Sequence, residues 1–177
     1  VPESASSDET PCCVGTYQPA SRTDSCIDAS PGYYVSSAFA TSQTACSPGT
    51  YQPNDGSTQC IDAGDGHYVA GTGQEVHTSC PVGTYQPNVG STGCIDASPG
   101  YFVDSNGSTT QTGCQAGTYQ PGEGQSSCVD AEEGHYVSGT KSTEQTPCGP
   151  GTYQDNSCLL YTSPSPRDVE ESRKPSS

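Results

Sequence analysis

The sequence is short of the side chains that usually fill a protein core. Its 177 residues include no methionine and no tryptophan, and its two leucines, Leu159 and Leu160, stand near the C-terminal end. Cationic residues are scarce as well, because five Lys and Arg face 20 Asp and Glu, which gives a formal net charge of -15. This composition excludes a conventional enzyme core and disfavours nucleic acid as a partner, since an acidic chain repels phosphate.

Paired metal-binding knuckles are also missing, because none of the 11 cysteines forms a C-x-x-C pair. Small domains that lack a sufficient core are commonly held by disulfides, which persist in oxidising compartments. The chain is therefore predicted to be extracellular or on the cell surface. It shows no signal peptide and no membrane-spanning run, and because it begins at Val1 we expect a fragment whose membrane anchor lies elsewhere.

A long repeat organises most of the chain. The triplet Gly-Thr-Tyr recurs without an insertion at a constant step of thirty-four, and the segment C-[IV]-D-A recurs at the same step; the triplets begin at Gly15, Gly49, Gly83, Gly117 and Gly151. Glycines midway between these triplets halve the period, so that a G-x-[YF] unit returns at every seventeenth position. Fixed periods of this kind mark a tandem array whose units pack on their neighbours. The aromatic residues of the units are Tyr17, Tyr34, Tyr51, Tyr68, Tyr85, Phe102, Tyr119, Tyr136 and Tyr153.

The cysteines follow the longer period and disappear in pairs. Cys46 and Cys60 correspond, after a shift by the shorter period, to Ala63 and His77, and the other repeats lose both cysteines together in the same way. Disulfide partners explain this joint loss most simply, whereas the longer alternative, Cys26 with Cys46, does not. Closing a loop of about 15 residues should stabilise the fold by roughly 3 kcal/mol. The predicted pairs are Cys12 with Cys26, Cys46 with Cys60, Cys80 with Cys94 and Cys114 with Cys128, with Cys13 unassigned.

Local patterns predict strands and turns rather than helices. Segments such as GTYQPN and GHYVAG place aromatic residues and Val between Gly, Pro, Asn and Ser, and no window has helical periodicity. We predict a small disulfide-rich all-β fold, an elongated tandem array of short β-hairpin half-modules, each one shorter period in length. A β-solenoid is the alternative.

The spacing of the repeats also divides the chain into units. The pattern breaks after Gln154: Cys158 stands four residues before its expected position, so a bond between Cys148 and Cys158 would be out of register. The following residues contain both leucines and three of the five basic residues, which is typical of a disordered or foreign read-through tail. The expected units are a lead-in (1–11), four repeats (12–45, 46–79, 80–113 and 114–147), a truncated fifth repeat (148–158) and the tail (159–177).

The run CSPGTYQPNDGSTQC, residues 46–60, resembles the cysteine-rich repeats of ephrin receptors and the first module of tumour-necrosis-factor-receptor cysteine-rich domains. The resemblance extends over about residues 12 to 154. It implies an extracellular, elongated, disulfide-laddered β-rod with a bond between the two cysteines of each unit. The family usually continues C-x-x-C where this chain has C-[IV]-D-A, so the second bridge of each repeat is missing and the rod is stapled in alternate half-modules.

Candidate catalytic and metal-binding residues have simpler interpretations. Cys60 in a disulfide offers no thiolate to His67, whose counterparts are tyrosine in two repeats, which favours a surface position. His77 lies near Cys80, but its counterparts are glutamines, which are poor transition-metal ligands, so a solvated loop is favoured. We therefore expect no catalytic residues, no metal site and no enzyme activity.

One aspartate per repeat forms a ladder: Asp28, Asp62, Asp96 and Asp130. Calcium needs six to eight oxygens around one ion, and the first aspartate has no acidic neighbour, so a carboxylate that caps a turn is favoured over a calcium site. The aromatic column is expected to be buried against the disulfides and neighbouring units rather than exposed to sugars.

Asn106-Gly107-Ser108 is an N-glycosylation sequon in a predicted turn. We expect a non-enzymatic extracellular spacer rod, a fragment of a larger cell-surface or fibre-forming protein, without cofactor and with self-assembly or unidentified protein or glycan partners. A ligand-binding receptor or adhesin ectodomain is the alternative, and the segment around Phe39 is where its binding site is expected.

Overall fold

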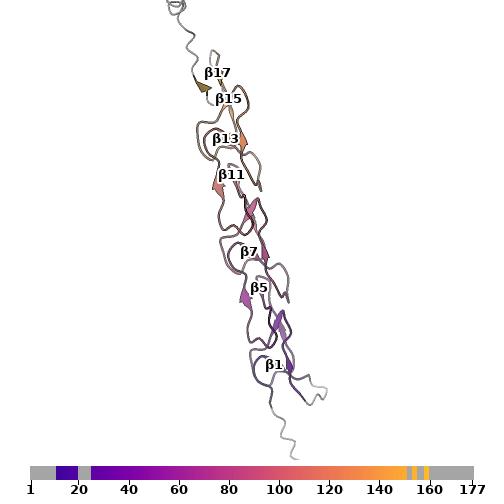
Figure 1. Ribbon diagram of the computed structural model, residues 1–177. Helices are drawn as coiled ribbons and strands as arrows, with labels where there is room; N and C mark the ends of the chain where they lie inside the picture. The colour runs from indigo at the N-terminus through magenta and orange to yellow at the C-terminus, as the bar shows by residue number, and fades with distance from the viewer. Residues whose placement is uncertain (1–10, 20–24, 151–152, 155–157, 160–177) are drawn as a thin grey trace, which may run out of the picture.

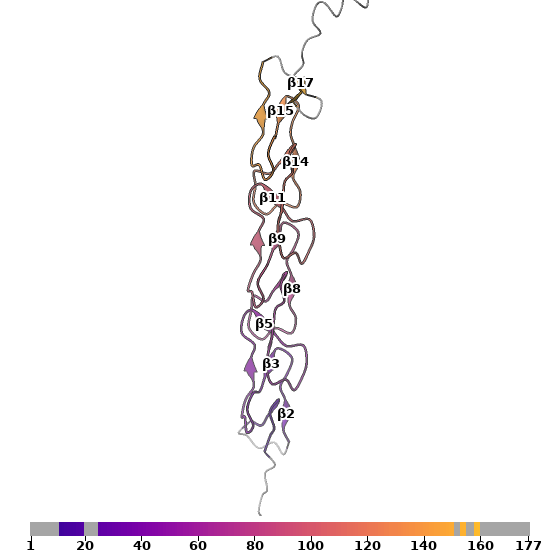
Figure 2. The same ribbon diagram turned by 90° about the vertical axis from the view of Figure 1, so that its left-hand side faces the viewer.

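The computed structural model describes residues 11–19, 25–150, 153–154 and 158–159, with side chains described up to residue 150. Figure 1 shows an elongated rod whose labelled strands follow one another along the long axis, from β1 near one end to β17 near the other. The view turned by 90° in Figure 2 has the same narrow outline. No helix occurs in these residues, and hence none that could cross a membrane.

Eighteen strands lie in the described part of the chain, and each has two residues. Each odd-numbered strand pairs antiparallel with the strand that follows it, so the sheets have two strands each and do not close. The strands are β1 (Thr16–Tyr17), β2 (Ile27–Asp28), β3 (Tyr33–Tyr34), β4 (Thr44–Ala45), β5 (Thr50–Tyr51), β6 (Ile61–Asp62), β7 (His67–Tyr68), β8 (Thr78–Ser79), β9 (Thr84–Tyr85), β10 (Ile95–Asp96), β11 (Tyr101–Phe102), β12 (Thr112–Gly113), β13 (Thr118–Tyr119), β14 (Val129–Asp130), β15 (His135–Tyr136), β16 (Thr146–Pro147), β17 (Tyr153–Gln154) and β18 (Cys158–Leu159).

These hairpins confirm the small disulfide-rich all-β fold. In the hairpin of β5 and β6, Tyr51 lies opposite Ile61 and Thr50 opposite Asp62, and equivalent registers recur along the chain. The β-solenoid alternative does not hold for the described strands, because a solenoid stacks strands of successive coils into long sheets. Here each strand pairs inside its own hairpin.

Two kinds of half-module alternate along the rod. We call residues 12–28, 46–62, 80–96 and 114–130 the stapled half-modules, because each carries one disulfide. Residues 29–45, 63–79, 97–113 and 131–147 are the unstapled half-modules.

Backbone hydrogen bonds join each half-module to the next. Between the half-modules 46–62 and 63–79, the Gly49 N–H donates to the Val69 carbonyl at 2.8 Å and the Gln52 N–H to the Gln74 carbonyl at 3.0 Å. A third bond runs back, from the Gly73 N–H to the Cys46 carbonyl at 2.8 Å. The same three bonds recur at every junction from the first half-module to the last, so stapled and unstapled half-modules are joined alike.

Glycines also bring together half-modules that are two places apart. Gly83 has a φ of 84°, and a Cβ atom added there would overlap the carbonyl oxygen of Gly124. The equivalent glycines, from Gly15 to Gly100, make the same close approach to the half-module two places on. Glycine is therefore required here for both its conformation and its small size.

The core is thin and lies along the axis of the rod. Its buried apolar side chains are four cysteines (Cys12, Cys46, Cys80 and Cys114), four valines (Val35, Val69, Val103 and Val137) and small alanines such as Ala63. The expectation of a buried aromatic column was wrong, because the eight aromatic side chains of the G-x-[YF] units from Tyr17 to Tyr136 are half-buried. From Val35 to Val137 the residue after each aromatic is buried instead, since successive side chains of a strand point to opposite faces.

In the stapled half-modules the residue after the aromatic is a glutamine, and from Gln52 to Gln120 both the nitrogen and the oxygen of its amide make a hydrogen bond. Gln86 is 6% exposed, and its Nε2 donates to the Gly93 carbonyl at 2.7 Å. Its Oε1 accepts the Asn88 N–H at 3.1 Å. Gln52 and Gln120 are bonded in the same way, so each polar side chain ties the two arms of its hairpin from the inside.

Candidate functional site

The disulfides of the described residues close the stapled half-modules. Each joins two cysteines 14 residues apart, with Cα atoms 5.6 to 5.8 Å from one another. They link the residues that the alternation of cysteines singled out: Cys12 with Cys26, Cys46 with Cys60, Cys80 with Cys94, and Cys114 with Cys128.

The remaining cysteines differ in their state. Cys13 is a free, exposed thiol. Cys148 is disulfide-bonded, and the side chain of its suggested partner, Cys158, lies outside the described residues. Cys60 is bonded to Cys46 and therefore has no thiolate. It cannot act as a nucleophile activated by His67.

In three unstapled half-modules a glutamine replaces the staple. Gln111 stands where a stapled half-module has its second cysteine, and its Oε1 accepts the Ser98 N–H at 2.7 Å. Gln43 and Gln145 make the same bond, at 2.7 Å, with the N–H groups of Ser30 and Glu132. The side chain therefore closes the same loop by a hydrogen bond. The recurrence of Gln at that position is the signal from which this role could have been found.

The half-module 63–79 is the exception, because it has His77 at this position. The His77 ring stacks on the His67 ring, with centroids 4.2 Å apart and planes 20° apart, and lies 4.9 Å from the Tyr51 ring. The carbonyl oxygen of Asp65 lies 2.9 Å from Nδ1 of His67. The sequence treated the two histidines as separate surface residues, whereas the structure brings them together. In the described part of the chain, the Gly64 N–H is left without a partner.

The aspartate ladder lies in the strands, not in turns. Asp62 belongs to β6 and is exposed, and its carboxylate lies beside Gly90 of the half-module two places on. The carboxylates of Asp28, Asp62, Asp96 and Asp130 accept no hydrogen bond from the described residues, so the expected role as turn caps was wrong. No group of three or more His, Cys, Asp and Glu side chains that could hold a metal is found among the described residues.

Two residues take the left-handed conformation at a position that is glycine in the intervening half-modules from 46 to 130. Lys141 has a φ of 59°, and its Nζ lies 5.3 Å from the centroid of the Tyr101 ring. Its side chain runs over Gly113, where a Cβ atom would clash with it. Phe39 has a φ of 60° and is 74% exposed. Lys141 thus packs on an earlier half-module, whereas Phe39 presents its ring to solvent.

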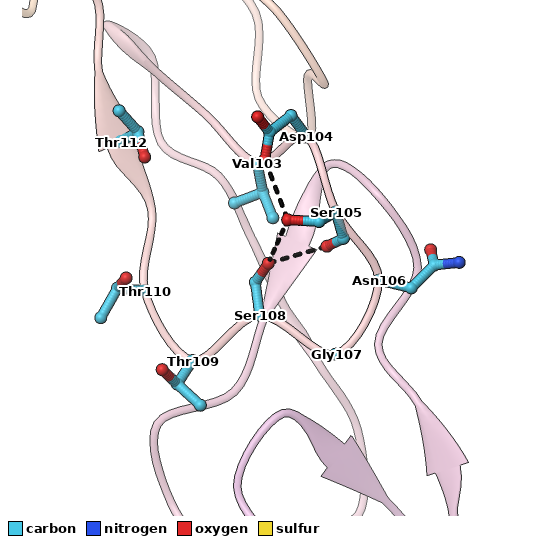
Figure 3. A pocket seen from close by; sticks show the side chains of 9 residues that line it. All are labelled: Val103, Asp104, Ser105, Asn106, Gly107, Ser108, Thr109, Thr110 and Thr112. Atoms are coloured by element: carbon cyan, nitrogen blue, oxygen red, sulfur yellow. Dashed lines mark hydrogen bonds between the residues drawn. The ribbon is translucent and has the colours of Figure 1, made fainter.

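The predicted glycosylation site lies in an open loop of the half-module 97–113. Residues 103–110 and Thr112 line a hollow of about 390 Å³ that is rich in hydroxyl groups. Figure 3 shows Ser105 and Ser108 pointing toward one another, while the side chain of Asn106 is directed away from the loop. The Ser108 hydroxyl donates to the Ser105 carbonyl at 2.7 Å, and the Ser105 hydroxyl donates to the Asp104 carboxylate at 2.9 Å.

The comparison with protein families identifies part of this array. Residues 66–114 match the family model described as tyrosine-protein kinase ephrin type A/B receptor-like. This range includes the Cys80–Cys94 bridge, most of the unstapled half-module before it and all of the one after it. No curated protein matches the chain. The ephrin-receptor-like repeat is a non-catalytic ectodomain type, and the disulfides agree with an oxidising compartment, so both point to an extracellular, receptor-type region. At residues 66–114 the chain thus carries a cysteine-rich repeat of the ephrin-receptor-like type, which confirms for this segment the resemblance seen in the sequence.

Proposed function

We propose that the chain is a non-enzymatic extracellular spacer, part of a larger cell-surface or fibre-forming protein, whose repeats set the distance between the parts at its two ends. The observation that carries this proposal is the uninterrupted hydrogen-bond ladder. The same three backbone bonds join successive half-modules from residue 12 to residue 142, whether or not a disulfide is present.

A second feature supports this function. Close approaches such as Gly83 to Gly124 tie each half-module to the one two places on, so bending at one junction would also disturb the next contact. An array whose units contact their neighbours in a fixed way grows in length as units are added. Such a rod performs its function through reach and stiffness, and it needs no reactive group.

The test adds repeats in register. One or two further copies of residues 80–113 are inserted after residue 113, and the maximum dimension of the particle is measured by small-angle X-ray scattering. We expect equal increments for the first and second copy. As the control, a Gly/Ser linker with as many residues as one repeat is inserted at the same point, and it should add less length because such a linker is a flexible coil. Unequal increments, or increments no larger than those of the linker, would refute the spacer function.

A receptor or adhesin function is the second candidate, and Phe39 is the observation that favours it. A large exposed ring on a residue with left-handed backbone costs conformational energy, and with 74% of Phe39 exposed it gains little packing within the described chain. If this loop binds a protein partner, the chain should bind cells in a way that Phe39→Gly abolishes. Thr140→Ala, in the equivalent loop of the half-module 131–147, serves as a control that leaves such binding unchanged. Equal binding of wild type and Phe39→Gly would exclude the loop.

A further inference from the structure

We propose that Asn106 is an N-glycosylation site and that the fold of the loop 103–112 keeps it compatible with a glycan. The inference rests on the extracellular part of the proposed function, since the sugar is transferred in the secretory pathway. The sequon alone is a short motif that occurs by chance, so the argument depends on what each of its three residues does in the structure.

Ser108 is explained by the fold and therefore carries little information about modification. Its hydroxyl bonds to the carbonyl three residues earlier. Ser57, Ser91 and Ser142 make the same bond at the equivalent position in other half-modules. Gly107 is explained likewise, because its φ of 70° matches that of the other glycines at this turn. The residue that distinguishes the sequon is therefore Asn106.

The position of Asn106 faces solvent throughout the array. Its equivalents are chemically diverse, and all of them are exposed: Ala38, Asp55, Thr72, Val89, Glu123 and Thr140. Val89, for example, is 62% exposed. A bulky group attached at this position would project from the rod and would leave the contacts between half-modules undisturbed.

Asn106 also has a structural contact, and it is the one that glycosylation would preserve. Its Oδ1 accepts the Val82 N–H at 3.0 Å. Because the partner is a donor, the oxygen must face Val82, and Nδ2 points elsewhere. Nδ2 has no hydrogen-bond partner among the described residues. N-linked sugars are attached through Nδ2, so the glycan and the contact with Val82 use different atoms of one amide.

This contact does not by itself explain why asparagine is present. Four equivalents of Val82 in the described residues carry an N–H, and no side chain of these residues bonds to any of them: Val14, Asp65, Ala116 and Glu133. The array therefore tolerates an uncapped N–H at this place. A structural requirement for Asn106 is weak, and the outward-facing Nδ2 is the feature that remains.

The reaction is a single group transfer. The Asn106 Nδ2 forms a bond to the anomeric carbon of an oligosaccharide carried on a polyprenyl pyrophosphate. The bond from that carbon to the pyrophosphate oxygen breaks, the polyprenyl pyrophosphate leaves, and the amide loses one proton. The lipid-linked oligosaccharide of the secretory pathway is the co-reactant.

The experiment expresses the chain behind a secretory leader in a eukaryotic host and follows glycan by intact mass before and after digestion with an N-glycosidase. We expect a digestible mass increment on the wild type that peptide mapping places at Asn106. Asn106→Gln and Ser108→Ala should remove the increment, whereas Ser108→Thr should keep it.

Thr140→Asn supplies the matched control, because it creates a sequon with Lys141 and Ser142 in the equivalent loop, and Lys141 shares the left-handed turn of Gly107. Modification at both loops would support the role of this position. Modification of the Thr140→Asn loop without modification of Asn106, or of neither loop, would overturn the proposal. The spacer function does not depend on this result, because the length measurement tests it separately.

Discussion

The half-modules 80–96 and 97–113 are neighbours that reach the same backbone fold with different side chains. Both form a hairpin of two strands with two residues each, and both make the three hydrogen bonds of the ladder to the next half-module. The first is closed by the Cys80–Cys94 bridge and has Gln86 inside. The second is closed by the bond from the Ser98 N–H to Gln111 and has Val103 inside. The backbone pattern is therefore constant, and the closure of the loop is interchangeable.

The two closures differ in strength. A disulfide over a loop of about 15 residues contributes roughly 3 kcal/mol, whereas a neutral hydrogen bond contributes about 1 kcal/mol. The unstapled half-modules thus depend more on their neighbours. Lys141 shows one way in which they are tied down, since its side chain lies over Tyr101 and Gly113 of an earlier unstapled half-module.

The largest effect on the free energy of unfolding is expected from a contact that stapled and unstapled half-modules share. Gly83→Ala should lower the free energy of unfolding by about 4 kcal/mol, combining about 1–2 kcal/mol for the left-handed backbone with about 1–3 kcal/mol for overlap with the Gly124 carbonyl. Urea unfolding followed by tyrosine fluorescence measures the loss.

Gly117→Ala is the matched control for this substitution. Gly117 has a φ of 89°, close to the 84° of Gly83, but no atom of the described residues lies within 4 Å of an added Cβ atom. The control should therefore cost about 1–2 kcal/mol, the conformational part alone. Equal losses for the two variants would show that the contact between half-modules two places apart contributes nothing.

The second effect comes from exchanging one closure for the other. Cys46→Ala with Cys60→Gln gives a stapled half-module the residues of an unstapled one, and the Ser47 N–H is available to the new glutamine. We expect a net loss of about 2 kcal/mol, which is about 3 kcal/mol for the bridge less about 1 kcal/mol for the hydrogen bond. The local free energy of opening is read from native-state hydrogen exchange at the backbone N–H of Gln52, which bonds across the junction to the next half-module.

Cys80→Ala with Cys94→Gln tests whether the hydrogen bond is the reason for that difference. The residue equivalent to Ser47 is Pro81, which has no N–H to donate. The local free energy of opening should therefore fall by the full amount of about 3 kcal/mol in this double variant. Hydrogen exchange at the backbone N–H of Gln86 measures it. If both double variants lose the same amount, the glutamine closure adds no stability.

The sequence predicted the period, the hairpins and the bonded cysteines because these depend on spacing, which the letters record directly. It did not predict the core correctly. A strand of two residues has no periodicity of its own, so the abundance of tyrosine suggested that the tyrosine side chains fill the core. In the structure, from Val35 to Val137, the side chain of the following residue points inward instead. The contact of Gly83 with Gly124 was also missed, because it depends on how half-modules two places apart stack.

The candidate sites were predicted in part. The solvent-facing loop of Asn106 followed from Asn-Gly in a hydroxyl-rich segment, and the structure has this residue exposed. The pairing of His67 with His77 did not follow, because a loop separates them along the chain and only the hairpin brings the rings together. The turn-cap role expected for Asp62 failed since that residue lies in β6, opposite Thr50.

The smallest effect is expected where an unstapled half-module lacks both closures. His77→Gln should give the half-module 63–79 the bond that its three counterparts have, from the Gly64 N–H to the new amide oxygen. The gain is about 1 kcal/mol at most, because the ring contacts of His77 with His67 and Tyr51 are lost at the same time. NMR-detected hydrogen exchange should show slower exchange of the Gly64 backbone N–H, by up to about fivefold.

Gln111→Ala is the reverse experiment, and it should speed exchange of the Ser98 amide by a similar factor, since it removes the acceptor of that N–H. Slower exchange at Gly64 together with faster exchange at Ser98 would mean that a side-chain acceptor at this position closes the loop wherever cysteine is absent. Unchanged exchange at Gly64 in His77→Gln would mean that the histidine stack already closes this half-module as well as glutamine does.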